Sequence, residues 1–191
     1  MSTNKIKSKP SLCSTLRYAL ALNGNFYENA HNTKRNRRLA LSIVILAAVS
    51  HALGSGVILL INRAKIFVLL TGILIDAIAV VAGYYFWTFT IWKIGQWLKP
   101  IDPTYGDLLV PIGFAYAPQV LNFLTLIPLL GRPIELILAV WSLLAVIVAV
   151  RQGLDITTQQ AVFICLVGWP LIQIAIGSVQ LLEQQLVRWA S

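Results

Sequence analysis

The sequence predicts an all-α integral membrane protein with five transmembrane helices. Hydrophobic residues make up 58% of the 191 residues and charged residues only 12%, and most charges fall between long apolar runs. A helix needs roughly 20 apolar residues to cross the hydrocarbon core of a bilayer. Five such runs follow one another, near residues 39–61, 66–92, 108–128, 133–150 and 159–182. Residues 1–38 therefore form a polar arm, and residues 39–191 form the membrane domain.

The arm contains a short amphipathic helix. In "SLCSTLRYALALNGNFYENA", the apolar residues Leu12, Leu16 and Ala19 recur at helical spacing, and Arg17 lies off that face. Such a helix can lie on the membrane surface, or it can pack under the helical bundle. The pattern favours neither arrangement over the other.

The arm is also strongly basic. It carries eight of the 15 Lys and Arg residues of the chain, and the net charge is +8. This position beside the first span predicts anionic lipid headgroups as the partner, rather than nucleic acid. The residues expected to contact the headgroups come from "KRNRR": Lys34, Arg35, Arg37 and Arg38.

Charge asymmetry predicts the orientation. Eleven Lys and Arg residues lie on the side of the arm, and four lie on the other side. The more basic side normally faces the cytoplasm, so we expect a cytoplasmic amino-terminus. An interfacial aromatic belt is expected at the inner end of the second span, from Tyr84, Tyr85, Trp87, Trp92 and Trp97.

Two ionisable residues lie inside the spans, His51 in the first and Asp76 in the second. They are equidistant from the turn between these spans, so an antiparallel hairpin places them at the same depth. One hypothesis is a pair that binds or relays a proton or cation. The other, which we favour, is a structural hydrogen bond within the hairpin.

Prolines interrupt the third and fifth spans. Pro118 has no N–H and displaces the carbonyl of Phe114, and in lipid that carbonyl needs a new partner. The prolines and neighbouring amides form a candidate polar face that consists of Pro118, Gln119, Asn122, Pro170 and Gln173. Two kinked spans can enclose a polar site at mid-depth; alternatively, the amides serve as ordinary interhelical hydrogen bonds.

The turn "RQGLD" between the fourth and fifth spans is the last candidate site. Arg151 suits the carboxy-terminal end of a helix and can pair with Asp155. With Gln152 they form either a structured turn or a docking and headgroup contact. Catalytic, metal and cofactor motifs are not found: the histidines are His31 and His51, without a ligand cluster. We therefore expect no enzyme activity.

Several of these motifs together resemble the Yip1-domain family, in particular its bacterial and cyanobacterial branch. The resemblance covers about residues 20–175. It is carried by "GFAYAP", "IPLLG", a tryptophan, "AVRQGLD" and a cysteine followed by "GW", at Gly113, Phe114, Ala117, Pro118, Pro128, Gly131, Trp141, Arg151, Gln152, Asp155, Cys165, Gly168 and Trp169. It implies a five-span bundle with a cytosolic amino-terminus, in the plasma membrane or, in a cyanobacterium, the thylakoid membrane.

The expected function is non-catalytic: organising the membrane, or serving as an accessory or scaffold subunit with other membrane proteins or a second copy. One alternative is a small channel or transporter with a polar mid-membrane site. Another is a membrane-traffic factor, because eukaryotic Yip1 relatives contact Rab GTPases through their cytosolic part. The arm here is short and basic, and nothing in it marks a GTPase-binding region.

Overall fold

The computed structural model describes residues 11–61, 63, 65–98, 104–127 and 129–168. These residues form helices and turns and no strand, so the all-α prediction is confirmed for this part of the chain. The helices are α1 (Leu12–Leu20), α2 (Gly24–Glu28), α3 (Lys34–Ile61), α4 (Ile66–Leu98), α5 (Tyr105–Ala115), the 3₁₀ helix η1 (Ala117–Leu126), α6 (Gly131–Gly153) and a final helix, Thr158–Gly168.

Four segments are long and apolar enough to cross a membrane: Lys34–Ile61, Ile66–Trp97, Tyr105–Leu126 and Gly131–Gly153. They correspond to the first four predicted spans. The fifth predicted span begins as the shorter apolar helix Thr158–Gly168. Its remainder, with Pro170 and Gln173, lies outside the described residues.

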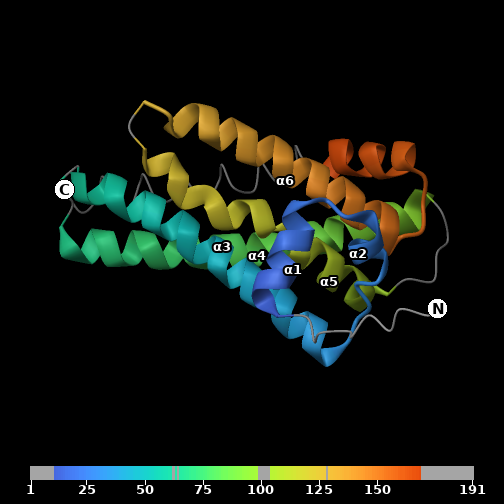
Figure 1. The fold of residues 1–191 in the computed structure, drawn as a ribbon. Helices are drawn as coiled ribbons and strands as arrows, with labels where there is room; N and C mark the ends of the chain where they lie inside the picture. The colour runs from blue at the N-terminus through green and yellow to red at the C-terminus, as the bar shows by residue number, and fades with distance from the viewer. Residues whose placement is uncertain (1–10, 62, 64, 99–103, 128, 169–191) are drawn as a thin grey trace, which may run out of the picture.

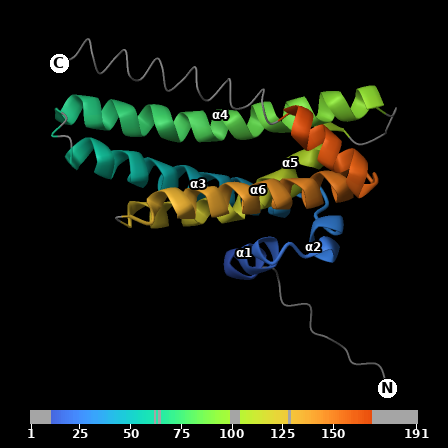
Figure 2. The same ribbon diagram turned by 90° about the horizontal axis from the view of Figure 1, so that it is seen from above.

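The spanning helices are antiparallel neighbours in three layers. The α3–α4 turn and the η1–α6 turn lie at one end of the bundle, and the start of α5 and the end of α6 lie toward the other (Figure 1). Seen from above, α4 forms one outer layer and the arm forms the opposite one, with α3, α5 and α6 between them (Figure 2). The 33 residues of α4 make it about 50 Å long, at roughly 1.5 Å per residue, so it extends past a hydrocarbon core of about 30 Å.

The centre of the bundle is α5, where every residue from 108 to 115 is buried. Gly113 allows this close packing, because a Cβ at that position would lie 2.8 Å from the Cβ of Ala40 on α3. Gly168 allows an equally close approach of its helix to α4, because a Cβ at that position would lie 2.6 Å from the ring of Trp87. Two glycines of the family-like motifs thus serve helix packing.

The arm packs against the bundle rather than lying apart from it. A reciprocal cap between Ser11 and Ser14 starts α1. The indole N–H of Trp141 on α6 donates to the carbonyl of Leu20 at 3.1 Å. The buried hydroxyl of Tyr27 lies 3.3 Å from the carbonyl of Ala19, and burial raises the pKa of this phenol. Of the two arrangements open at the sequence level, the structure has the packed one.

The sequence predicts that the third span is a single helix kinked at Pro118. The structure shows two helices of different type instead. The α-helical geometry ends at Ala115, and a 3₁₀ helix follows from Ala117. Pro118 explains the change, because it supplies no N–H and disfavours α geometry in the residue before it. The chain continues with i→i+3 bonds, such as Gln119 N to Tyr116 O at 3.0 Å.

Candidate functional site

The α3–α4 hairpin brings His51 and Asp76 together. His51 lies ten residues before the end of α3, and Asp76 lies ten residues after the start of α4. The imidazole Nδ1 is 2.8 Å from Asp76 Oδ2. When the carboxyl group is ionised, Nδ1 is the donor, because an ionised carboxylate only accepts hydrogen bonds. In that state the pair is a charge-assisted contact between α3 and α4.

Ser55 completes this cluster; its place four residues after His51 is evident in the sequence, but a contact with Asp76 was not predicted. The Ser55 hydroxyl donates to Asp76 Oδ2 at 2.6 Å, so this one oxygen accepts from both residues. Ser55 follows His51 by one helical turn, and that spacing on one face was the available clue. Because the hydroxyl is bonded to the carboxylate and not to the ring, the cluster is a shared acceptor and not an activated nucleophile.

The two side chains of the His51–Asp76 contact differ in their exposure. The side chain of Asp76 is 14% exposed, whereas that of His51 is 41% exposed. The carboxylate is thus held inside the hairpin, and the imidazole reaches its surface. Ionisable side chains inside membrane spans mark proton relays in many membrane proteins.

The polar residues beside Pro118 bond to neighbouring helices. Gln119 Nε2 donates to Ser142 Oγ on α6 at 3.0 Å. The backbone N–H of Phe123, in the 3₁₀ segment, donates to Ser50 Oγ on α3 at 2.8 Å. Asn122 instead bonds within the 3₁₀ segment, where its backbone carbonyl accepts from the Thr125 hydroxyl at 2.7 Å. The first two contacts connect the interrupted third span to both of its neighbours.

Ser50 and Ser142 were not identified from the sequence, although they accept from the Phe123 N–H and from the Gln119 side-chain amide. Each is a serine inside an apolar run. Such a serine can be recognised as a hydrogen-bond partner only when an interrupted helix is known to lie beside it. Pro170 and Gln173 lie outside the described residues, so the second kinked span and a cavity between the two remain predictions.

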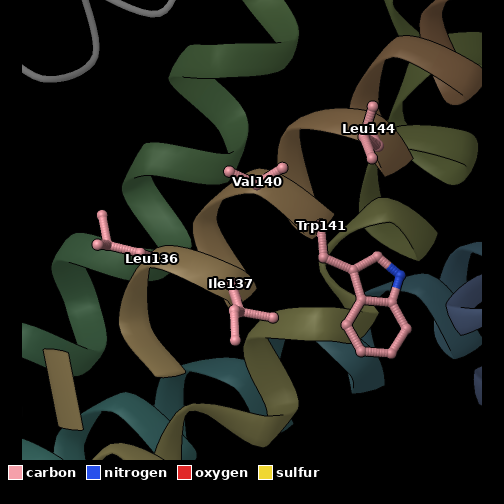
Figure 3. Close-up of a pocket in the computed structure, with 5 residues that line it drawn as sticks. All are labelled: Leu136, Ile137, Val140, Trp141 and Leu144. Atoms are coloured by element: carbon pink, nitrogen blue, oxygen red, sulfur yellow. The ribbon is translucent and has the colours of Figure 1, made fainter. Parts of the chain in front are cut away.

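The larger hollow on the described surface is apolar. It is an open groove of ≈ 410 Å³ along α6, and Figure 3 shows its lining residues: Leu136, Ile137, Val140, Trp141 and Leu144. A smaller hollow of ≈ 130 Å³ lies between α3, α4 and α5, lined by Arg37, Arg38, Leu41, Tyr84, Tyr85 and Leu109. Neither is lined by the amides of the third span.

The turn after α6 is a structured helix end. Leu154 N donates to Val150 O at 2.9 Å and Ile156 N to Arg151 O at 3.1 Å, while Asp155 takes a φ of 49°. Arg151 and Asp155 are exposed, and within residues 129–168 no ion pair joins them. Gln152 instead approaches the arm: its Nε2 would lie 3.3 Å from a Cβ at Gly24.

The four basic residues expected at the headgroups lie in the first turns of α3. The Thr33 hydroxyl caps this helix by accepting from Asn36 N at 3.1 Å. The side chains that follow are all exposed: Lys34, Arg35, Arg37 and Arg38. Of these, Arg37 and Arg38 also line the smaller hollow.

Comparisons with family models, with curated proteins and with solved structures found no match for this chain. The resemblance to the Yip1-domain family therefore stays a prediction.

Proposed function

We propose that this is a non-catalytic, multi-pass membrane protein that serves as an accessory or scaffold subunit of a larger membrane complex. In this proposal it forms a five-span, Yip1-like bundle with its amino-terminus in the cytoplasm. The observation that carries the proposal is the apolar groove along α6. Its proposed occupant is an apolar transmembrane helix of another membrane protein.

The groove is shallow and lies on the outer face of the single helix α6, the kind of surface that helix packing uses. Its lining residues lie at spacings of one and four along α6, so they form two parallel rows with a furrow between them. The ridge of a second helix fits into such a furrow. Val140, between the ends of the groove, is 55% exposed, so its side chain is open to a partner.

The interior supports a structural role for the same protein. Gln119 bonds Ser142, and Ser50 bonds the backbone of Phe123. The side chains of Gln119, Ser142 and Ser50 are thus engaged between helices, where such bonds are worth about 0.6 kcal/mol on average. The exposed apolar faces are then the surfaces through which the protein acts.

The test is affinity capture from the native membrane in a gentle detergent, with two matched variants. Val140→Trp fills the groove, and Ile78→Trp places the same side chain on α4 at a position with 58% exposure. We expect one recurrent stoichiometric partner, lost with Val140→Trp and kept with Ile78→Trp. A partner that both variants keep, or no recurrent partner, contradicts the proposal.

A second candidate function is a small channel or transporter for protons or cations. It is favoured by the exposed imidazole of His51 above the enclosed carboxylate of Asp76. Reconstitution into proteoliposomes separates the two functions. A proton or cation flux that Asp76→Asn abolishes supports transport. Equal background flux in the unmodified protein and the Asp76→Asn variant supports the scaffold function.

A further inference from the structure

The smaller hollow combines charge and aromatic rings in a way that the scaffold role does not need. Its walls come from three helices: Arg37, Arg38 and Leu41 from α3, Tyr84 and Tyr85 from α4, and Leu109 from α5. From these contacts we propose that it is a site for one anionic phospholipid, whose phosphate is bound by Arg37 and Arg38.

The depth of the hollow fits a headgroup. Arg38 lies 23 residues before the end of α3, which is about 35 Å at roughly 1.5 Å per residue. Tyr84 lies 18 residues after the start of α4, about 27 Å from the same end of the bundle. With a hydrocarbon core of about 30 Å, the guanidinium groups reach the phosphates and the tyrosines lie at the edge of the core.

The charge of the hollow selects an anion. Both arginine side chains are exposed, and in the part of the chain that the structure describes neither forms an ion pair. Among the described residues that line the hollow, none is acidic. A guanidinium group binds phosphate through two parallel N–H donors, so two adjacent arginines suit a phosphodiester better than a neutral headgroup.

The rest of the hollow is shaped for a lipid rather than for a soluble phosphate. The Tyr84 hydroxyl donates to the Leu109 carbonyl at 2.6 Å, and this bond holds α4 against α5 at the hollow. Leu41 lies one turn beyond Arg37 toward the membrane centre and is 37% exposed. A space of ≈ 130 Å³ takes a phosphate and the adjoining glycerol atoms, while the acyl chains run outside along Leu41 and Ile45.

The experiment is native mass spectrometry of the delipidated full-length protein, titrated with phosphatidylglycerol or with phosphatidylcholine of the same acyl chains. The test variant is Arg37→Gln/Arg38→Gln. The control variant, Arg17→Gln/Arg151→Gln, removes two exposed arginines that do not line the hollow. Arg37→Lys/Arg38→Lys keeps the charge and removes the guanidinium fork.

We expect one retained phosphatidylglycerol and no retained phosphatidylcholine. The test variant should bind phosphatidylglycerol about 25-fold more weakly, from roughly fivefold for each of the two basic residues at an anionic surface. The lysine variant should fall between, and the control should equal the unmodified protein. Equal losses in the test and control variants, or equal retention of both lipids, would overturn the site. Displacement of the lipid by millimolar glycerol phosphate would assign the hollow to a soluble phosphate instead.

Discussion

Replacing Asp76 by alanine removes the acceptor that joins α3 to α4 at mid-depth. The substitution leaves two donors without their partner: the His51 ring, 2.8 Å from the carboxylate, and the Ser55 hydroxyl, 2.6 Å from it. Hydrogen bonds between membrane helices average about 0.6 kcal/mol and reach about 1.7 kcal/mol. Losing both should therefore lower the free energy of unfolding by about 1–3 kcal/mol.

The assay is unfolding of the purified protein by increasing mole fractions of dodecyl sulfate in mixed micelles, followed by circular dichroism. Asp76→Asn should lose about half as much free energy as Asp76→Ala, because its amide oxygen still accepts from Ser55. Glu135→Ala is the control, since that carboxylate is exposed and lies 3.7 Å from exposed Arg132. Exposed pairs of this kind contribute about 0–1 kcal/mol.

Equal unfolding curves for Asp76→Ala and Glu135→Ala would refute the structural interpretation of the cluster. A coupling measurement sharpens the result. If His51 and Asp76 stabilise each other, the double substitution to alanine should cost less than the sum of the two single ones. Strict additivity would mean that the 2.8 Å contact contributes nothing to stability.

Three further substitutions test the packing around α5 and the arm. Ser50→Ala leaves the backbone N–H of Phe123 without its 2.8 Å acceptor and should cost about 1–3 kcal/mol in the same unfolding assay. Gly113→Ala places a Cβ about 2.8 Å from that of Ala40, and this overpacking should cost about 1–3 kcal/mol; an unchanged midpoint would contradict the close approach. Trp141→Phe removes the 3.1 Å bond to the end of α1, so trypsin should cleave the arm about fivefold faster, from about 1 kcal/mol for one hydrogen bond.

Hydropathy predicts the apolar core of each span well but not the ends of the helices. The helix α3 begins at Lys34, five residues before the predicted start of the first span, and α4 continues to Leu98, six residues past the predicted end of the second. Basic and aromatic residues continue a helix readily once it leaves the hydrocarbon core. A hydropathy scale therefore identifies the part of a helix that lies in the hydrocarbon core, but not the residue at which the helix ends.

The His51–Asp76 contact could be inferred from the sequence because it depends on local geometry. A short turn between two regular helices forces residues at equal distances from it to the same depth. Ser55 belongs to the same inference, since it lies one turn from His51 on the same helix. The sequence alone did not show that a hydroxyl there would reach the carboxylate at 2.6 Å.

The 3₁₀ segment and the docked arm could not be inferred, because distant contacts stabilise them. Phe123 N bonds Ser50 across 73 residues of chain, and Trp141 bonds Leu20 across 121 residues. A proline in the sequence shows that a helical bond is lost, but not which distant group replaces it. A long 3₁₀ helix is unfavourable by itself, so its presence depends on those neighbours.

The most direct test of the scaffold role is site-specific photo-crosslinking in the native membrane. A photoreactive residue in place of Val140 reports on the α6 groove, and one in place of Ile78 reports on an equally exposed part of α4. We expect one discrete protein adduct from position 140 and only lipid adducts from position 78. Lipid adducts alone from both positions would contradict the scaffold role.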